Sequence, residues 1–251
     1  MPELPEVEHA RVFVEEHGLG RAIAAAVDRD TYVCRPHAPG EIDDALRGRT
    51  LTSAHRRGKT MWFQTDGGDG PVLGLHLGMA GRMVADVPEA PNRWDRFALE
   101  FEDGGRLALR DKRRLGRAVL NPDLCDLGPD AAEIGRDAFR RRVGRGAAPL
   151  KARLMDQSVI AGVGNLLADE TLWQARLSPL RPAGDLSDAE LDGLRKTLRL
   201  CTRRAIRKGG VHTGEVIVDR GRGQRCPRCK VEMQRAVVGG RTTFFCPAEQ
   251  T

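Results

Sequence analysis

The sequence predicts an α+β fold, in which an N-terminal helix leads into a β-rich half, a helical half and a small C-terminal hairpin module. Three observations support this prediction. Apolar residues recur at helical spacing at the start, short β-like runs fill residues 21–120, and helical periodicity then continues to about residue 210. The 251 residues exceed the usual single-domain length of about 150, so two domains are expected.

The first element is a helix over residues 3–17. Leu4, Val7, Arg11 and Val14 lie three or four residues apart, as on one face of an amphipathic helix, and Gly18 follows as a stop. The β-rich half comes next. Its clearest signal is a hairpin, in which residues 97–101 and 106–109 flank the turn at 103–105. Several such runs indicate a sandwich or a barrel.

The second half begins after a Pro- and Gly-containing linker at residues 121–135. Ser187 and Glu190 form a capping box that opens a helix running to Gly209. Beyond it, residues 216–218 and 242–245 read as short strands around a group of cysteines. The chain is thus expected to divide into domains at 1–122, 129–212 and 213–251.

Composition and charge narrow the class of protein. Apolar residues make up 40% of the chain, and no run approaches the roughly 18 residues of a membrane span. The first thirty residues lack the pattern of a secretory signal, so an intracellular location is expected. Net charge is +6, and residues 201–251 hold eleven Lys or Arg against four acids. Such a basic end favours a phosphate-binding surface, although solvated arginines would look the same.

The extreme N-terminus could supply a nucleophile. A small second residue favours removal of Met1, which would leave Pro2 as a secondary amine with a pKa near 8. An amine that attacks a sugar C1′ gives a Schiff base, and Glu3 beside it could protonate the ring oxygen. The simpler interpretation is that the prolines and acids of this segment only start a helix.

A glycine-rich turn at residues 157–165 could bind an anion. Gly162, Gly164 and Asn165 precede a helical segment, so backbone N–H groups at the helix start could face a phosphate. A plain linker between two helices, with Asn165 as N-cap, would have a similar sequence.

The C-terminal cysteines suggest a metal site. Cys226 and Cys229 form one Cys-x-x-Cys knuckle, and Cys246 begins a second in which Glu249 replaces the fourth cysteine. Paired knuckles of this kind bind zinc, and a carboxylate can act as a ligand. We therefore predict a zinc site made of three cysteines and Glu249, with a metal-free hairpin as the alternative.

The β-rich half contains candidate DNA contacts. Lys59, His76 and Arg113 are basic residues near predicted turns, and Met79 and Leu115 are apolar residues on predicted loops. Basic side chains could contact phosphates, and an apolar side chain on a loop could wedge into a base stack. Each could equally be a solvated charge or a core residue.

These signals occur in an order that resembles the formamidopyrimidine-DNA glycosylase/endonuclease VIII family. The resemblance rests on three stretches. They are Met1-Pro2-Glu3-Leu4-Pro5-Glu6-Val7-Glu8, the segment from Leu154-Met155-Asp156-Gln157 through Gly162-Val163-Gly164-Asn165 to Ala168-Asp169-Glu170, and Val238-Gly239-Gly240-Arg241 before Cys246-Pro247. It spans essentially the whole chain.

The resemblance implies a fold and a reaction. The fold is a catalytic helix on a two-layered β-sandwich, a helix-two-turns-helix domain and a C-terminal β-hairpin zinc or zincless finger. The reaction is excision of a damaged base followed by β,δ-elimination, which makes the chain a bifunctional DNA glycosylase and AP lyase of base excision repair. The partner would be double-stranded DNA with a damaged base or an abasic site, bound by a monomer in the bacterial cytoplasm at the nucleoid.

The resemblance also implies roles for individual residues. Pro2 would be the Schiff-base nucleophile, Glu3 the acid and Glu6 a neighbouring support. The phosphate contacts would come from Lys59, His76, Asn165 and Arg241, and the gap left by the flipped nucleotide would be filled by Met79, Arg113 and Leu115.

Two departures from the family pattern bear on the substrate. Members that prefer 8-oxoguanine usually have Phe in place of Leu115, and a long loop before the finger. Here only fifteen residues separate Gly210 from Cys226, so we expect an open pocket that favours oxidised pyrimidines, ring-opened purines or bulky alkyl adducts. The alternatives are a non-cleaving lesion-binding protein of the same fold and an RNA-binding zinc-ribbon protein. The scarcity of aromatic residues disfavours the latter.

Overall fold

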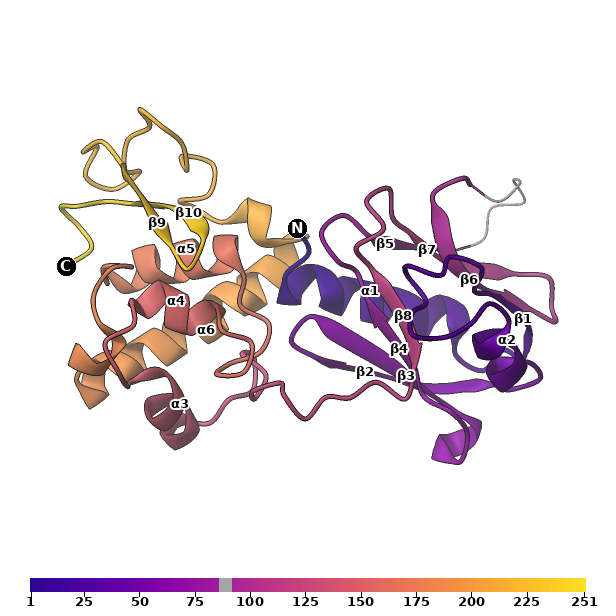
Figure 1. The fold of residues 1–251 in the computed structure, drawn as a ribbon. Coiled ribbons are helices and arrows are strands. Elements are labelled where there is room, and N and C mark those ends of the chain that lie inside the picture. Colours follow the sequence, from indigo (N-terminus) through magenta and orange to yellow (C-terminus); the bar gives the residue numbers. More distant parts are fainter. Residues whose placement is uncertain (86–91) are drawn as a thin grey trace. The chain divides into compact units, whose positions relative to one another are not determined.

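The computed structural model describes residues 1–85 and 92–251, which divide into two compact units. The first unit comprises Met1–Pro2 and Val7–Leu124, and the second comprises Glu3–Glu6 and Cys125–Thr251. Helix α1 (Leu4–Gly18) thus begins in the second unit and ends in the first (Figure 1). Among the described residues, no helix has both the length and the apolar character needed to cross a membrane.

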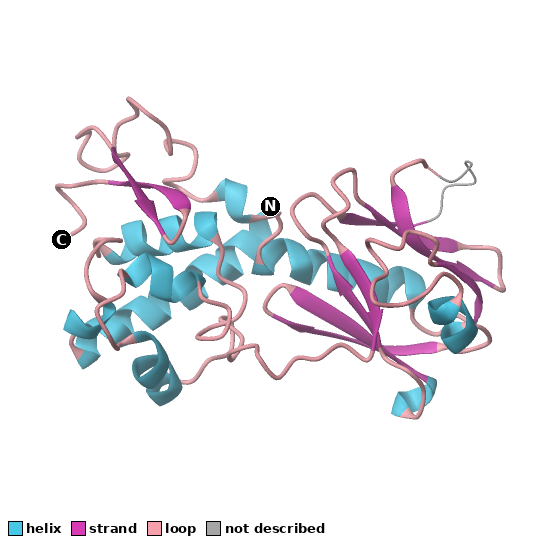
Figure 2. Ribbon diagram, viewed as in Figure 1, coloured by secondary structure: helices cyan, strands magenta, loops and turns pink. Residues whose placement is uncertain are grey.

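The first unit is built on two antiparallel four-stranded sheets (Figure 2), which confirms the predicted sandwich. One sheet has the order β1-β6-β7-β5 and the other β2-β3-β4-β8. Their bounds are β1 (Ile23–Val27), β2 (Leu51–Arg57), β3 (Thr60–Thr65), β4 (Leu73–His76), β5 (Arg82–Ala85), β6 (Asp95–Phe101), β7 (Arg106–Arg110) and β8 (Arg117–Leu120), with α2 (Glu41–Leu46) and η1 (Asp66–Gly68) between strands. The predicted hairpin at 97–109 is β6–β7.

One apolar core joins both sheets of this unit. In β3, Met61, Phe63 and Thr65 are buried and alternate with half-buried residues, which is the period-two pattern of a strand with one face on the core. Val7 and Val14 of α1 belong to the same cluster of buried residues. The helix therefore covers the sandwich with the apolar stripe that its sequence predicts.

The second unit is helical and ends in a hairpin. Its elements are α3 (Arg136–Val143), α4 (Leu150–Met155), α5 (Asn165–Ala175), η2 (Ala183–Asp185), α6 (Asp188–Lys208), η3 (Val211–Thr213), β9 (Gln234–Val238) and β10 (Arg241–Phe245). The capping box of Ser187 and Glu190 is confirmed, and α6 ends at Gly209, whose φ of 93° suits glycine.

The strand predicted at residues 216–218 is wrong, because this segment is a turn. The Val216 N–H donates to the Glu170 carboxylate at 2.9 Å, and the Val216 carbonyl accepts from Asp219. Neither group is then available to a neighbouring strand. β10 pairs instead with β9 through the two-residue turn Gly239–Gly240, where both φ values are positive.

Candidate active site and nucleic-acid interface

The Glu3 carboxylate caps the N-terminus of α5. It is 1% exposed, and its two oxygens accept N–H bonds from Gly164 (3.1 Å), Leu166 (2.8 Å) and Leu167 (3.0 Å). The first N–H groups of a helix have no partner within the helix, and the helix dipole favours a negative charge there. A residue adjacent to Pro2 in the chain is thereby fixed on the glycine-rich turn.

Gly164 makes this approach possible. A Cβ at Gly164 would lie 2.3 Å from Glu3 Cδ and 2.6 Å from Cγ, far inside van der Waals contact. The Gln157 side chain organises the rest of the turn, because its amide donates to Val163 O at 2.9 Å and its carbonyl accepts from Gly162 N at 3.0 Å. Gly164 is the N-cap of α5 and Asn165 its first residue, so the alternative of Asn165 as the N-cap is not observed.

Glu6 connects Glu3 to the segment after α6. Its Oε2 accepts the Glu3 N–H at 2.9 Å and its Oε1 accepts the Val211 N–H at 2.7 Å. A Cβ on Gly210 would lie 2.5 Å from Oε1, so this contact also depends on a glycine. The carboxylate thus holds the N-terminal residues and the chain after α6 together.

Asn165 is oriented by a buried lysine. The Lys151 ammonium, 0% exposed, donates to Asn165 Oδ1 at 2.6 Å and to Thr243 Oγ1 at 2.7 Å. It also forms an ion pair with Asp169 at 2.7 Å. Since the Asn165 oxygen is used by the lysine, its amide NH₂ is the end that remains for an anion.

Burial lowers the pKa of Lys151, an effect that the facing Asp169 carboxylate partly offsets. Asp169 also accepts from Arg220 Nε at 2.5 Å, and Arg220 bonds the Thr242 carbonyl. The segment between α6 and the finger is therefore bound at three points, namely Val211, Val216 and Arg220.

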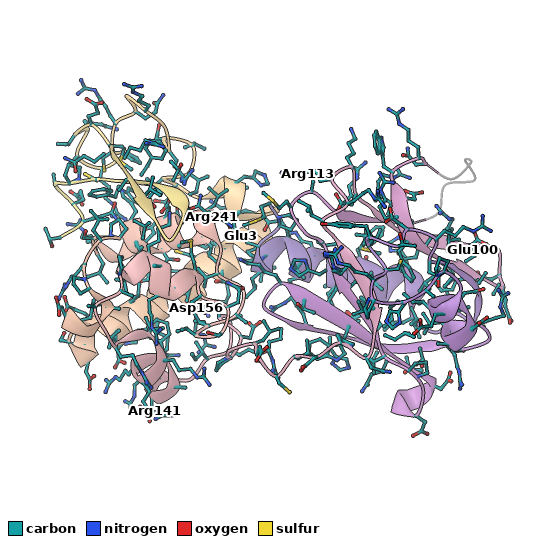
Figure 3. All side chains as sticks on the ribbon, in the orientation of Figure 1. Glu3, Glu100, Arg113, Arg141, Asp156 and Arg241 are labelled. Atoms are coloured by element: carbon teal, nitrogen blue, oxygen red, sulfur yellow. The ribbon has the colours of Figure 1, made fainter. Side chains whose placement is uncertain are left out.

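Arg241 stands exposed at the first position of β10 (Figure 3). The turn before it lies on helix α4, where a Cβ at Gly239 would meet Met155 and Ala152 at 3.2 and 3.5 Å. Lys151 of α4 holds the same hairpin through Thr243. Within the second unit, one buried lysine thus connects the Asn165 turn to the strand that carries Arg241.

In the first unit, Lys59 lies at the β2–β3 turn and His76 lies on the neighbouring strand, β4. Lys59 is in the β2–β3 turn beside Thr60, which pairs with His76 of β4. Burial lowers the pKa of His76 and the positive charge of Lys59 lowers it further, so the ring is neutral near pH 7. Its Nδ1 accepts the Gly78 N–H at 3.0 Å, which leaves Nε2 as a donor.

Three predicted gap-filling residues lie on two loops that touch. Met79 and Leu115 are 41% and 36% exposed, and Arg113 is exposed beside them in sequence (Figure 3). The loops meet at Gly78, whose φ is 61° and whose Cβ would lie 2.4 Å from the Leu115 carbonyl carbon. Buried Asp111 shapes the second loop by accepting N–H bonds from Arg113, Leu115 and Gly116 at 2.8–2.9 Å.

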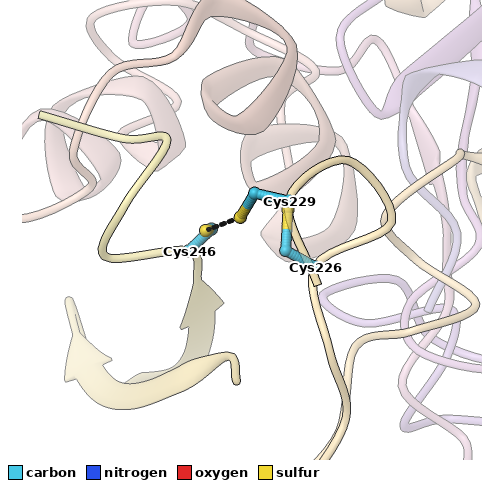
Figure 4. Close-up of side chains that lie close together, drawn as sticks. All are labelled: Cys226, Cys229 and Cys246. Atoms are coloured by element: carbon cyan, nitrogen blue, oxygen red, sulfur yellow. Dashed lines mark hydrogen bonds between the residues drawn. The ribbon is translucent and has the colours of Figure 1, made fainter. Parts of the chain in front are cut away.

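Three cysteines form a cluster compatible with zinc (Figure 4). The Sγ atoms of Cys226, Cys229 and Cys246 all lie within 4.8 Å of one another, and the last two are 3.4 Å apart. Zn–S bonds of about 2.3 Å in a tetrahedron place sulfurs about 3.8 Å apart, so these residues fit the ion. Burial raises the pKa of Cys226, but backbone N–H groups and the Trp173 indole outweigh it and lower the pKa overall.

Glu249 lies outside this cluster. Its Oε2 is 3.4 Å from an Arg176 nitrogen and accepts no hydrogen bond from the residues that the structure describes. The finger also has contacts with α5 that need no metal. Arg228 stacks on Trp173 with its guanidinium carbon 3.6 Å from the ring centroid and donates to the Trp173 carbonyl. Ligation by Glu249 stays a prediction.

The comparisons with known proteins agree with this architecture. The family model "Formamidopyrimidine-DNA glycosylase N-terminal domain" matches residues 1–118, and "Formamidopyrimidine-DNA glycosylase H2TH domain" matches residues 127–215. "Zinc finger found in FPG and IleRS" matches residues 223–248. The predicted helix-two-turns-helix domain and finger are therefore confirmed.

Individual relatives cover the whole chain. A formamidopyrimidine-DNA glycosylase of Nocardioides is 37% identical over 283 residues, covering 100% of this chain and 94% of the relative. Two solved structures of Lactococcus lactis Fpg each cover 99% of both chains with a TM-score of 0.87. One is a complex with abasic-site DNA (27% identity), the other with DNA containing N7-benzyl-Fapy-dG (28% identity). The chain therefore belongs to the formamidopyrimidine-DNA glycosylase family of base excision repair enzymes.

Proposed function

We propose that this chain removes damaged bases from duplex DNA and then cleaves the abasic site through a Schiff base on Pro2. The observation that carries the proposal is Glu3, a carboxylate adjacent to Pro2 in the chain, buried and bound to the N-terminus of α5. Removal of Met1 would free the Pro2 amine. We further propose that the protein acts in the bacterial cytoplasm, at the nucleoid, where its DNA substrate lies.

In the proposed chemistry, the Pro2 nitrogen attacks C1′, and the base leaves with the electron pair of its bond to C1′ and takes a proton from water. The amine must then lose its proton, and the sugar ring oxygen must gain one, for the ring to open to an iminium ion. The three N–H bonds to Glu3 favour its ionised form, so we assign it both transfers: it takes the proton from Pro2 and passes it to the ring oxygen. Loss of a proton from C2′ of the iminium ion then expels the 3′ phosphate (β-elimination), and a second proton loss expels the 5′ phosphate (δ-elimination).

Phosphate binding is assigned to four donors. Asn165 offers its NH₂ because Lys151 occupies its oxygen, and His76 offers Nε2–H because Gly78 occupies Nδ1. Lys59 and Arg241 supply charge. A neutral imidazole donor keeps its hydrogen bond across a wide pH range, since the pKa of His76 is already lowered.

The wedge is assigned to Met79, Arg113 and Leu115. Two exposed apolar side chains on touching loops can enter the stack, and the arginine can face the unpaired base. Asp111 and Gly78 fix the loops that present them. The wedge is therefore preformed, and base extrusion would draw its energy from binding.

For the lesion, we propose ring-opened purines, oxidised pyrimidines or bulky alkyl adducts instead of 8-oxoguanine alone. The connection after α6 is short and bound by carboxylates at Val211, Val216 and Arg220, which disfavours a loop that closes over the base. The complex of the Lactococcus relative with N7-benzyl-Fapy-dG DNA is consistent with such a pocket in the family.

The test is a comparison of single-turnover excision rates on duplexes that differ only in the lesion. We expect ring-opened and alkylated purines to be released at least as fast as 8-oxoguanine. A strong preference for 8-oxoguanine would contradict the lesion assignment but leave the chemistry intact. Tight lesion binding with neither base release nor strand cleavage would instead establish the non-cleaving alternative.

A further inference from the structure

Helix α6 carries an unusual excess of positive charge. Between Gly193 and Gly214 the sequence contains seven Lys or Arg residues and no acid. They are Arg195, Lys196, Arg199, Arg203, Arg204, Arg207 and Lys208. None has a role in the site described above.

Four of these residues form a row along one face of the helix, which we call the α6 cation row: Lys196, Arg199, Arg203 and Arg207. They are spaced three or four residues apart, so they lie above one another over about 16 Å of helix. Lys196, Arg203 and Arg207 are exposed and Arg199 is half-buried. The buried residues of α6, such as Leu198, Cys201 and Ala205, point roughly 150° away at 3.6 residues per turn.

The row has no internal counter-charge. In the described part of the chain, none of the four forms an ion pair. Asp192 lies one turn before Lys196, but its carboxylate is bound by Arg140 at 2.7 Å; Arg140 is the main cause of its lowered pKa, and Lys196 adds a small part. Other arginines of this protein, among them Arg21 and Arg49, do pair with carboxylates.

Like charges at this spacing repel one another and disfavour the helix. Of the four residues of the row, only Arg207 lies in the last turn of α6, where the helix dipole favours a cation. The repulsion within the row therefore lowers the stability of α6, and no ion pair among the described residues compensates for it. Such an arrangement is typical of a surface that binds a polyanion.

We propose that the α6 cation row binds a second segment of duplex DNA through its phosphates, independently of the lesion. This inference rests on the proposed function, because it assumes that a first duplex occupies the site at Asn165 and Arg241. One DNA strand presents a negative charge about every 3.4 Å of axis, so a row of about 16 Å can face several phosphates.

The composition of the face favours DNA over a protein partner. Among the described residues of α6, Leu200 is the one large apolar side chain that is exposed, at 37%. Protein interfaces are usually centred on a cluster of apolar or aromatic side chains, which this face lacks. Helix α6 contains no aromatic residue that could stack on the bases of a single strand. The row therefore favours a duplex, which it can bind through phosphate contacts alone.

The row is also separate from the finger hairpin. Helix α5 packs against α6 and also contacts β10, so it lies between them in the second unit (Figure 1). The cation row is on the face of α6 that turns away from its buried side. A duplex held at Arg241 and one held at the row would therefore meet different sides of this unit.

The test is the stoichiometry of complexes with a short duplex of about 15 base pairs, roughly 50 Å long at 3.4 Å per pair, measured by sedimentation at low salt. The duplex carries an abasic-site analogue and is added in excess. We expect wild-type protein to bind two duplexes and the variant Lys196→Gln/Arg199→Gln/Arg203→Gln/Arg207→Gln to bind one with unchanged affinity. In variants that lack only one or two cations of the row, the slope of log K against log salt for the second duplex should fall by about 0.9 for each cation removed.

A matched control removes four arginines that are paired with carboxylates, Arg21→Gln/Arg47→Gln/Arg49→Gln/Arg136→Gln, and so changes net charge equally. It should keep the second duplex. Single binding by wild type, equal loss in the control, or weakened binding of the first duplex in the row variant would each overturn the inference.

The proposed function is tested separately by Asn165→Ala/Arg241→Ala. This variant should lose preference for the lesion duplex but keep binding that depends on the row. If it loses both, the row is not an independent surface. If wild type shows binding through the row but no lesion preference, the proposed function fails and the inference about the row stands.

Discussion

Replacing Gly164 by alanine tests the contact between Glu3 and helix α5. The added Cβ would lie 2.3 Å from Glu3 Cδ, whereas ordinary contacts begin near 3.4 Å, so the carboxylate must move by about 1 Å. Hydrogen bonds of 2.8–3.1 Å would then lengthen beyond their range. The φ of Gly164 is −119°, so the substitution acts through this collision and not through backbone strain.

The expected effect on stability is large. Hydrogen bonds to charged groups contribute about 1.5–3 kcal/mol each, and water can replace part of this at a helix end, so we expect a loss of about 3–5 kcal/mol. Misplacing a catalytic group by about 1 Å can cost on the order of 100-fold in rate. We therefore expect Gly164→Ala to lower both the free energy of unfolding and the single-turnover rate at an abasic site.

The assay is urea unfolding combined with single-turnover strand cleavage. Gly193→Ala is the control, because a Cβ there meets nothing within 4 Å in the exposed interior of α6, and alanine should stabilise the helix by up to about 1 kcal/mol. If Gly164→Ala cleaved at the wild-type rate with unchanged stability, the Glu3 contact would have neither the structural nor the catalytic role assigned to it.

Three further outcomes follow from the structure. Hydrogen bonds from Arg181 and from the capping box lower the pKa of Glu190 from 4.5 to about 2. The stabilisation by the ionised carboxylate is therefore complete above pH 4.5 and is lost as the pH falls toward 2. The difference in unfolding free energy between wild type and Glu190→Gln should shrink over that pH range, and a constant difference would argue against the ionised contact. Lys151→Met should weaken binding of abasic-site DNA about 5- to 10-fold, because the lysine orients Asn165 and holds the strand of Arg241 through Thr243. The loss should be smaller in an Asn165→Ala background, where only the contact with Thr243 is left to lose. Fluorescence titration in both backgrounds checks this, and fully additive losses would be inconsistent with it. Elemental analysis should find about one zinc per chain. A chelator should lower the melting temperature, while β9–β10 keeps its contacts with α4. Complete unfolding of the second unit would show that the metal alone holds this unit together.

The sequence correctly predicted those elements that are determined by interactions between residues close together in the chain. The capping box at Ser187, the helix stop at Gly209 and the hairpin of β6 and β7 are all fixed by neighbouring residues, and the structure has them as expected. The strand prediction for residues 216–218 failed because the β propensity of this segment was outweighed by the hydrogen bond from Val216 to Glu170, 46 residues away in sequence. No local pattern reports such a contact.

The site shows the same division. Residue type suggested Pro2 as a nucleophile and Glu3 as an acid. It did not suggest that Glu3 would cap α5, more than 160 residues away in sequence. Lys151 was missed because a lysine in a helix is normally exposed, and only the tertiary structure shows it buried against Asp169. Gly164 was a usable signal for such a contact. A glycine at the N-cap has no side chain to accept hydrogen bonds from the first N–H groups of the helix, so an acceptor must come from elsewhere in the chain.

Borohydride trapping tests the central claim most directly. Processed protein, with Met1 shown by mass spectrometry to be removed, is incubated with a duplex that contains one abasic site and is then reduced. We expect a covalent protein–DNA band that disappears in Pro2→Gly and is strongly reduced in Glu3→Gln, in which the proposed proton-transfer group is lost. No band from the processed wild-type protein, or an undiminished band in Pro2→Gly, would contradict the assignment of Pro2 as the nucleophile.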